Sequence, residues 1–476
     1  MATAFRRAIN MCVIGHVDSG KSTTVGNLVY QLGFVGERVM EKLKNIAETK
    51  GKESFSYAFV TDTSDSERDR GITINNTLIH IKTSKFELNI IDCPGHKDFI
   101  KNMVTGAAQA DVGIVIVPCA ANEFEKAISG GTLKSHITIS GIVGVKKLIV
   151  GINKTDAVPE GSQKQRFEEV RDEMKRIISK IHPDKDPIII PISGYKGINI
   201  VEKGEKFSWF EGTMKEGQNI KTLEGAIDFQ SVPERPIGKP LRMPIVSIHK
   251  ISGIGTVYTG RVDAGVIKPG MQVTIQPADI CAEIKSLEIH KEAQTEVMAG
   301  DNCGLALKSI TKGDITQIKA GNVVSEAKNS PIVMFEGARA KIMIIDHPKG
   351  IKPGYCPVMD LGTHHVPVKL VKFLSKKAQG VKETITDPDL ASKGDTLLCV
   401  IQPQKSTVME VMTEYPSLAK FALRDGGAVV GIGAIEHRYS ADEFKEVTGI
   451  SAKTEGKGKV VDKKKAPVGR SKAPAG

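Results

Sequence analysis

Eight residues close to the N-terminus constrain the fold of this chain more than any other feature of its sequence. Residues 15–22, GHVDSGKS, match the pattern G-x-x-x-x-G-K-[ST]. They follow an apolar run and precede a segment of helical period, which is the context that a phosphate-binding loop requires. Without that context, the same letters describe only a glycine-rich turn. The sequence therefore predicts a strand, a loop that holds phosphate groups, and a helix.

Such a loop binds phosphate mainly through its backbone. Glycines let the chain curl, so that several N–H groups and the start of the next helix face the phosphate oxygens. In this arrangement Lys21 bridges the β- and γ-phosphates, and the Ser22 hydroxyl binds Mg²⁺. The nucleotide contacts predicted here are Gly15, His16, Val17, Asp18, Ser19, Gly20, Lys21, Ser22 and Thr23.

The first 230 or so residues alternate apolar, strand-like runs with segments of helical period. The runs cover residues 9–14, 86–91, 112–117, 147–152 and 187–192, and the clearest helical segments cover residues 21–32, 97–109 and 163–181. This alternation predicts a mostly parallel sheet with helices on both faces. The ligand site of such a sheet lies beyond the carboxyl ends of its strands.

A second motif, DCPGH at residues 92–96, ends another apolar run. Asp92 can hold Mg²⁺ through a water molecule, and Gly95 leaves room for its N–H to meet a γ-phosphate. His96 follows, in a position to orient an attacking water. A strand-terminal Asp taken alone is more often a helix N-cap, but the phosphate loop upstream favours the nucleotide role. The predicted contacts are Asp92, Cys93, Pro94, Gly95 and His96, with His96 as the catalytic residue.

Two further motifs concern the base, NKTD at residues 153–156 and SGYKG at residues 193–197. Asp156 can accept hydrogen bonds from N1–H and N2–H₂ of guanine, whereas adenine would leave the carboxylate unpaired. Strings such as N-K-x-D also occur as surface turns, but their order after the other motifs favours base recognition. The predicted contacts are Asn153, Lys154, Thr155, Asp156, Ser193, Gly194 and Tyr195, and the nucleotide is GTP rather than ATP.

The segment RGITI, residues 70–74, follows a polar stretch at residues 61–69. That stretch is too polar to fold alone, which predicts a switch loop ordered by the γ-phosphate and Mg²⁺. Thr73 would give the metal a second hydroxyl, so the predicted metal ligands are Ser22, Thr73 and Asp92. The alternative is that residues 71–74 simply begin a β-strand.

The composition of the chain changes at residues 233–240, where three prolines predict a stiff, extended linker. Short β-rich runs with turn signals follow, and a second set begins near Pro331. These runs predict two small closed antiparallel barrels. The predicted units are residues 5–232 for the GTP-binding domain, 233–240 for the linker, 241–330 and 331–445 for the barrels, and 446–476 for a tail.

The charge of the chain is concentrated at its end. The net charge is +11, and residues 452–476 contain eight Lys or Arg against two acidic residues. This tail is rich in Lys, Gly, Ala and Pro and has no apolar period, which predicts disorder. The rest is mildly basic, which permits a polyanionic partner without requiring one.

Several patterns bear on the compartment. The longest apolar runs are far shorter than the roughly 20 residues that span a bilayer, and the N-terminus lacks the apolar core of a signal peptide. The seven cysteines are scattered without a C-x-x-C pair, so neither a disulfide framework nor a thiolate zinc site is indicated. We expect a cytoplasmic protein without a membrane partner.

Taken together, the motifs resemble the translational GTPases, and among them the elongation factor 1-alpha family of eukaryotes and archaea. The similar segments of the first domain are GHVDSGKST, RGITI, DCPGHKDFIKNM, NKTD and SGYKG. Beyond it they are KISGIGTVYTGRVDAGVIKPG (250–270), EIHKEA (288–293), GDNCG (300–304), HPKGIKPGYCPVMD (347–360) and KFALRDGGAVVGIG (420–433). The resemblance covers about residues 5–440.

The resemblance implies a three-domain factor that binds aminoacyl-tRNA in its GTP form and delivers it to the ribosomal A site. Hydrolysis then follows codon–anticodon pairing, the GDP form releases the tRNA, and an exchange factor is a further partner. It also implies that His96 positions the attacking water behind a hydrophobic gate made by Val17 and Ile72. The family's aminoacyl pocket places His290 and Asn302 near the charged end of the tRNA.

The chain departs from the family pattern in three places. Residues 126–140 differ from the sequence that is usual in the family. Lys291 replaces the family's second His, and Cys93 replaces its Ala. Cys93 is small and should leave its loop intact. We expect residues 126–140 to lie on a helix away from the phosphates, where they would affect partner docking rather than nucleotide chemistry.

Three alternatives remain at this point. A release-factor-like or ribosome-rescue GTPase would have a long N-terminal extension, whereas the first strand here is predicted near residue 8. A sulfate-adenylylating relative fits the later segments poorly. An actin-binding module that uses the second barrel and the basic tail is a secondary role from a different class.

Overall fold

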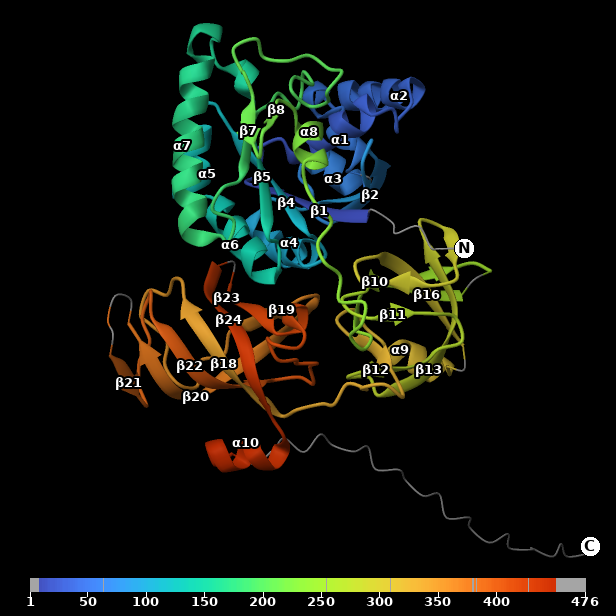
Figure 1. The fold of residues 1–476 in the computed structure, drawn as a ribbon, viewed down its shortest axis with the longest axis vertical. Coiled ribbons are helices and arrows are strands. Elements are labelled where there is room, and N and C mark those ends of the chain that lie inside the picture. The colour runs from blue at the N-terminus through green and yellow to red at the C-terminus, as the bar shows by residue number, and fades with distance from the viewer. Residues whose placement is uncertain are drawn as a thin grey trace, which may run out of the picture.

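The computed structural model describes residues 8–450 except residues 63, 254, 309, 379, 380, 382 and 427. An α/β domain lies above two β-domains that sit side by side (Figure 1). Residues 5–7 of the predicted first domain and residues 451–476 of the predicted tail lie outside the described residues. Within the described part of the chain, no helix is both long and apolar enough to cross a lipid bilayer.

A six-stranded sheet forms the centre of the first domain, in the order β2-β3-β1-β4-β5-β6. Its strands are β1 (Ala8–Gly15), β2 (Thr77–Lys82), β3 (Glu87–Asp92), β4 (Val112–Pro118), β5 (Lys147–Asn153) and β6 (Ile188–Pro191). All neighbours pair in parallel except β2, which runs antiparallel to β3 at the edge. The predicted mostly parallel sheet is confirmed. Sequence analysis did not find β2, a short edge strand in which only Ile81 is fully buried.

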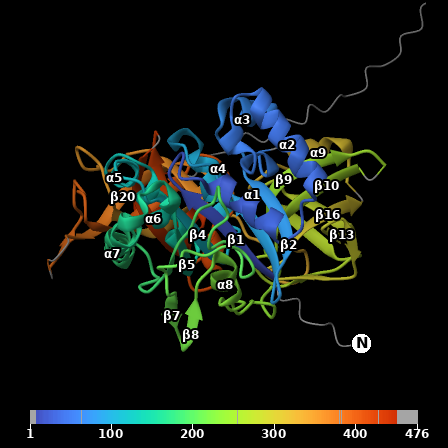
Figure 2. The same ribbon diagram turned by 90° about the horizontal axis from the view of Figure 1, so that it is seen from above.

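Helices cover both faces of this sheet, so its central strands are buried on both sides. The helices are α1 (Lys21–Gln31), α2 (Glu37–Thr49), α3 (Asp65–Arg70), α4 (Ile100–Ala107), α5 (Glu123–Ser129), α6 (Leu133–Val143), α7 (Gln163–Ile181) and α8 (Leu223–Asp228). One core packs α4–α7 against the sheet, and the other packs α1 and α8 against the opposite face. Figure 2 shows α2 and α3 on one side of the sheet and the hairpin of β7 (Thr213–Lys215) and β8 (Gln218–Ile220) on the other.

Six strands close each β-domain into an antiparallel barrel, as predicted. The first barrel contains β9 (Met243–Ile251), β10 (Gly255–Arg261), β12 (Gln272–Gln276), β13 (Ile280–Ile289), β16 (Asn302–Lys308) and β17 (Val323–Glu326), and pairing of β12 with β13 closes it. The second contains β18 (Gly337–Ile344), β19 (Val358–Leu361), β20 (His364–Lys377), β22 (Thr396–Pro403), β23 (Lys420–Asp425) and β24 (Ala428–Tyr439), and pairing of β19 with β20 closes it.

Short elements decorate the barrels. They are β11 (Val266–Ile267), β14 (Glu292–Gln294), β15 (Val297–Met298), α9 (Lys312–Gln317), β21 (Thr384–Thr386) and α10 (Ala441–Thr448). Helix α10 begins with a capping box in which Ser440 and Glu443 satisfy each other's backbone N–H groups. Its Phe444 is fully buried against the second barrel.

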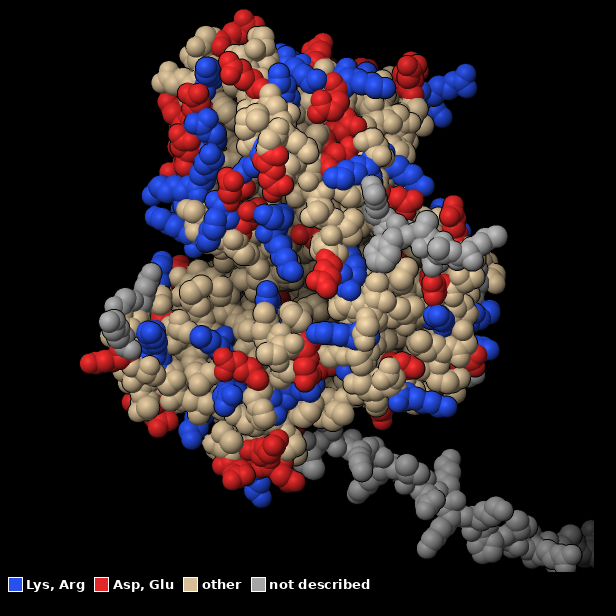
Figure 3. Space-filling model, viewed as in Figure 1, with Lys and Arg blue, Asp and Glu red and all other residues tan. Residues whose placement is uncertain are grey.

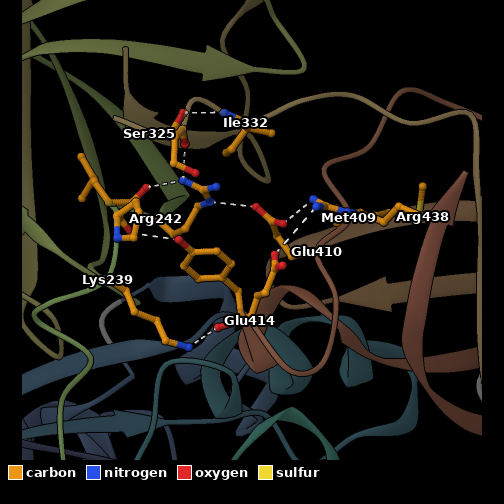
Figure 4. Close-up of polar contacts among 12 residues, drawn as sticks. Lys239, Arg242, Ser325, Ile332, Met409, Glu410, Glu414 and Arg438 are labelled. Carbon is orange, nitrogen blue, oxygen red and sulfur yellow. Dashed lines mark hydrogen bonds and ion pairs between the residues drawn. The ribbon is translucent and has the colours of Figure 1, made fainter. Parts of the chain in front are cut away.

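A buried ion network joins the two barrels (Figure 4). Arg242 of the first barrel donates to Glu410 of the second over 2.8 Å, and their side chains are only 3% and 1% exposed. Arg438 donates to the other oxygen of Glu410, and the guanidinium of Arg242 stacks 4.5 Å from the ring centre of Tyr415. Glu410 is thus enclosed by two cations, one from each barrel.

A second buried carboxylate joins the first domain to the linker and the first barrel. Asp111 accepts two hydrogen bonds from Arg235, over 2.7 and 2.8 Å, and one from Arg261 over 2.5 Å. Burial raises the pKa of Asp111, but the two guanidinium groups outweigh it, so that the net shift is downward. Arg261 also donates to the Gln109 carbonyl over 2.8 Å.

The first domain meets the second barrel through a histidine. The Thr105 hydroxyl on α4 lies 3.1 Å from Nε2 of His365, whose Nδ1 lies 2.6 Å from the buried Asp360 carboxylate. Arg424 donates to the same carboxylate over 2.9 Å. Asp360 therefore holds the imidazole in the orientation that reaches α4.

We expect Glu410→Gln to lower the free energy of unfolding by about 3–5 kcal/mol, because it leaves the buried Arg242 without a counter-charge among the described residues and removes the nearer of the two carboxylates beside Arg438. The matched control is Glu436→Gln, since Glu436 pairs with Arg339 over 3.7 Å at the surface, with side chains 39% and 41% exposed. Its effect should stay below about 1 kcal/mol. Urea unfolding followed by circular dichroism measures both. Equal losses of stability in the two variants would contradict a stabilising role for the buried ion network around Glu410.

Candidate nucleotide-binding site

A cavity of about 360 Å³ lies where the phosphate loop and the other predicted motifs converge, at the carboxyl end of the sheet. Thirteen of the residues predicted from the sequence line it: Val17, Asp18, Gly20, Lys21, Ser22, Thr23, Thr73, Gly95, His96, Asn153, Lys154, Asp156 and Tyr195. Segments separated by more than a hundred residues in the chain therefore share one cavity.

Other predicted residues lie next to this set without lining the cavity: Gly15, His16, Ser19, Asp92, Cys93, Pro94, Thr155, Ser193 and Gly194. Most of them shape or hold the loops that line the cavity. A Cβ at Gly15 would lie 2.4 Å from the Ile116 carbonyl oxygen, so no side chain fits there. The Thr155 hydroxyl donates back to the Ile152 carbonyl over 2.9 Å and fixes the turn after β5.

The phosphate loop wraps around the side chain of Lys21. Its ammonium donates to the His16 carbonyl over 2.8 Å, and Gly20 precedes α1 in a left-handed conformation with φ of 85°. A Cβ at Gly95 would lie 2.5 Å from the Lys21 nitrogen. Glycine at position 95 therefore allows the second motif to approach the phosphate loop closely.

Hydroxyls and carboxylates meet at one end of the cavity. Ser22 and Thr73 bring their hydroxyl oxygens within 3.0 Å of each other, and Thr73 donates to Asp62 over 3.1 Å. The Asp92 carboxylate is fully buried, and neither oxygen has a hydrogen-bond partner among the described residues. Burial raises the pKa of Asp92, and burial followed by repulsion from Asp92 raises that of Asp62 to about 7.

This donor set fits a hard divalent cation. Buried carboxyl groups with raised pKa values favour an added positive charge, and hydroxyl and carboxylate oxygens are the ligands that Mg²⁺ prefers. Among the described residues, no group of three or more His, Cys, Asp or Glu could hold a metal. A cation here would therefore need hydroxyls and phosphate oxygens in addition to the carboxylates.

Asn153 ties the base-recognition motifs to the phosphate loop. Its amide nitrogen donates to the Ser19 carbonyl over 2.8 Å, and its amide oxygen accepts the Gly194 N–H over 2.8 Å. Asn27 on α1 donates to the Gly194 carbonyl over 2.8 Å. Beyond this junction Asp156 lies 3.7 Å from the Lys196 ammonium, and its carboxylate lines the cavity.

His96 lines the same cavity and follows Gly95, which lies against the phosphate loop. Its Nδ1 accepts the Asp98 N–H over 3.2 Å, and its side chain is 36% exposed. Val17 and Ile72 line the same cavity. His96 thus shares the cavity with two apolar residues, one on the phosphate loop and one in the RGITI segment.

Two sequence-based expectations were wrong. The polar stretch at residues 61–69 contains helix α3 rather than only a loop, because Ser64 and Glu67 form a capping box at its start. The Glu67 carboxylate also accepts the N–H groups of Ile74 and Asn75 over 3.0 and 3.1 Å. The S-x-x-E spacing in the sequence would have indicated this helix start.

The second correction concerns residues 126–140, which do not lie away from the phosphate loop. The Thr132 hydroxyl donates to the Gly95 carbonyl over 2.8 Å and lies 3.2 Å from Nδ1 of His16. His136, one turn further, is fully buried, and burial lowers its pKa to about 3. Thr132 joins two loops of the site, a contact that no local sequence pattern reveals.

The residues expected near the tRNA end lie at the joint between the first domain and the first barrel. The His290 ring stacks on that of His80 with centroids 3.5 Å apart. Asn302 donates to the Asn10 side chain over 3.0 Å. Both residues therefore contact the first domain in this arrangement.

Comparison with known proteins gives consistent matches along the chain. Residues 6–233 match the GTP-binding domain of elongation factor Tu, residues 255–325 match elongation factor Tu domain 2, and residues 337–436 match a GTP-eEF1A C-terminal domain-like family. The three matches follow the order of the α/β domain and the two barrels.

Two curated proteins are similar over most of their length. Elongation factor 1-alpha of Encephalitozoon cuniculi is 48% identical over 463 residues, which cover 96% of this chain and 98% of that protein. Elongation factor 1-alpha of Entamoeba histolytica is 43% identical over 433 residues, 90% of this chain and 95% of that protein. The S. cerevisiae Ski7 GTPase-like domain, 18% identical with a TM-score of 0.72 and covering 90% of this chain and 97% of that one, shares the fold.

We expect Thr132→Val to speed GDP dissociation about fivefold, because the two loops lose a hydrogen bond that contributes about 1 kcal/mol. Thr132→Ser should restore the slow rate. The matched control is Thr138→Val on the exposed side of the same helix, where the hydroxyl donates only to the Lys134 carbonyl. Stopped-flow fluorescence of a labelled GDP measures the rates. Identical rates for Thr132→Val and Thr138→Val would refute the role of Thr132.

Proposed function

The chain belongs to the elongation factor 1-alpha family, and from this premise we propose how its pocket and domains work. It is a GTPase that binds guanine nucleotides. It delivers aminoacyl-tRNA to the ribosome during translation elongation, and GTP hydrolysis triggers release of the tRNA. No observation favours a release factor, a rescue GTPase or a sulfate-adenylylating enzyme.

One observation carries the assignment of the pocket. The phosphate loop, the DCPGH motif and the NKTD motif come from three distant parts of the chain, and residues of all three line a single cavity. The sites of nucleotide contact are the residues named from the sequence, from Gly15 to Thr23, Asp92 to His96, Asn153 to Asp156 and Ser193 to Tyr195. Asp156 selects guanine, since its carboxylate matches the donor pair of that base alone.

Within this pocket Lys21 and the backbone N–H groups of the phosphate loop hold the triphosphate. Ser22, Thr73 and Asp92 would hold Mg²⁺, which when bound neutralises charge on the β- and γ-phosphates. Two features support this set: the hydroxyls of Ser22 and Thr73 lie 3.0 Å apart, and Asp92 is buried without a partner among the described residues. Asp62 accepts a hydrogen bond from Thr73 and adds negative charge beside these proposed metal ligands.

His96 acts on the attacking water. His96 lines the cavity together with Gly95 and Lys21, and this supports its orienting a water toward the γ-phosphate. Val17 and Ile72 restrict its approach until the ribosome repositions it. The loop that carries His96 leads directly into α4, so its movement is transmitted to the joint with the second barrel.

The predicted domain units are residues 5–232, the linker 233–240, the barrels at residues 241–330 and 331–445, and a tail at residues 446–476. Helix α10 continues to Thr448, so we place the start of the tail after this helix rather than at residue 446. His290 and Asn302 are the positions nearest the charged tRNA end, and their location at the joint between the first domain and the first barrel supports this role. We place the protein in the cytoplasm and include a guanine-nucleotide exchange factor among its partners. Actin is a secondary candidate partner of the basic tail.

Delivery of tRNA requires affinity that depends on both the nucleotide and the amino acid. We expect the GTP-bound protein to protect the aminoacyl ester of charged tRNA from hydrolysis, and the GDP-bound protein to give little protection. The rate of loss of a radiolabelled amino acid from tRNA measures this. Equal binding of charged and uncharged tRNA in both nucleotide states would remove the delivery role while leaving the GTPase intact.

We expect His96→Ala to slow ribosome-stimulated GTP hydrolysis by about 10²–10⁴-fold, the usual contribution of a group that positions or deprotonates a nucleophile. GTP affinity should change little, because Lys21 and the backbone N–H groups of the phosphate loop supply most of the contacts to the triphosphate. The control is His347→Ala, a histidine on a loop of the second barrel whose ring meets that of Tyr355 edge to face. Single-turnover hydrolysis with ribosomes measures the effect. Undiminished turnover in His96→Ala would exclude His96 from the mechanism.

A further inference from the structure

A second cavity, of about 220 Å³, lies where all three domains and the linker meet. It is lined by Lys146 of the first domain, Arg235 of the linker, Arg261 of the first barrel and Lys420 of the second. None of these residues lines the nucleotide pocket. Figure 3 shows the molecule hollowed where the first domain meets the barrels, with Lys or Arg side chains along the hollow.

Some of the charge in this cavity is already compensated. Asp111 binds both Arg235 and Arg261, and the half-buried Asp263 lies close enough to Arg261 for their charges to interact. Two guanidinium groups therefore face two carboxyl groups. The remaining carboxylate of the lining, Glu234, is exposed on the linker.

The two lysines are different, because neither forms an ion pair with any described residue within 4.0 Å. Lys146 lies in the turn before β5 and is exposed, whereas Lys420 begins β23 and is half-buried. Burial, followed by repulsion from Lys146, lowers the pKa of Lys420. Two like charges, one from the first domain and one from the second barrel, thus line the same cavity.

One of the lining residues also carries an unused donor. The Nε atom of Arg261 is buried and has no hydrogen-bond partner among the described residues. A buried donor without an acceptor is unfavourable, and so is a pair of close ammonium groups without a counter-charge. A bound anion relieves the repulsion between the lysines, and it offers oxygen acceptors to the donors around it.

We propose that this cavity is a binding site for a phosphate dianion, free or carried as a small monoester, held between Lys146 and Lys420. A phosphate group presents several acceptor oxygens and up to two negative charges, which match two point-like ammonium groups. Because the lysines belong to different domains, the anion stabilises the arrangement in which the first domain contacts the second barrel. This site is separate from the GTPase reaction.

Isothermal titration calorimetry with inorganic phosphate and with glycerol 3-phosphate tests the proposal. The full chain is first saturated with Mg²⁺ and a non-hydrolysable GTP analogue, so that the nucleotide pocket is filled. We expect saturable binding of one anion per chain, weakened about tenfold or more by Lys146→Gln or Lys420→Gln, the loss expected for one charge-assisted hydrogen bond. Tighter binding of glycerol 3-phosphate would identify a monoester as the ligand, and tighter binding of inorganic phosphate would identify the free ion.

The matched control is Lys147→Gln. Lys147 is the exposed neighbour of Lys146, pairs with Asp184 over 3.9 Å and does not line the cavity. Its substitution should leave anion binding unchanged. Absence of saturable binding to the wild-type chain, unchanged affinity in both lysine variants, or an equal loss in Lys147→Gln would each overturn the proposal. Lys146 is exposed, so Lys146→Gln keeps the test valid even if Lys420→Gln fails to fold.

Discussion

Three buried carboxylates hold the domains of this chain together, and each is shared by two nitrogen-bearing side chains. The carboxylates are Asp111, Glu410 and Asp360, which contact Arg235 and Arg261, Arg242 and Arg438, and His365 and Arg424, respectively. A buried carboxylate that loses one partner is left with charge in a medium of low polarity. At the joints formed by Asp111 and Glu410, the partners come from different domains. Separating the domains therefore breaks a whole network rather than a single contact.

The joint at Asp360 connects the nucleotide pocket to the second barrel. The loop that carries His96 continues through one 3₁₀ turn into α4, and Thr105 on that helix meets His365. Thr132 contacts the same loop from α6, the helix that packs near β23. A displacement of this loop would therefore alter two contacts, the one between Thr105 and His365 and the one between Thr132 and Gly95. These contacts connect the loop of the DCPGH motif to the second barrel.

Sequence patterns predicted what depends on short stretches of chain. The parallel strands, helix α7 and the motifs around the pocket follow from apolar runs, helical period and loop residues that occur together within about twenty positions. Contacts between domains could not be predicted from the sequence. The stacking of His80 on His290, for example, depends on how the first barrel docks on the first domain. Thr132 was missed for the same reason: its position beside Gly95 depends on packing of α6 and not on its neighbours in the chain.

The balance between burial and nearby cations differs between the joints of the domains and the nucleotide pocket. At Asp111 two guanidinium groups outweigh burial, and the pKa of the carboxyl group falls. At Asp92 and Asp62 burial has the larger effect, and both pKa values rise. A joint must persist without a ligand, so its charge is neutralised within the chain. A site that binds a cation with its nucleotide gains from buried carboxylates whose compensation arrives only with the ligand. At these carboxyl groups the direction of the pKa shift therefore follows from whether guanidinium groups of the same chain contact the carboxylate.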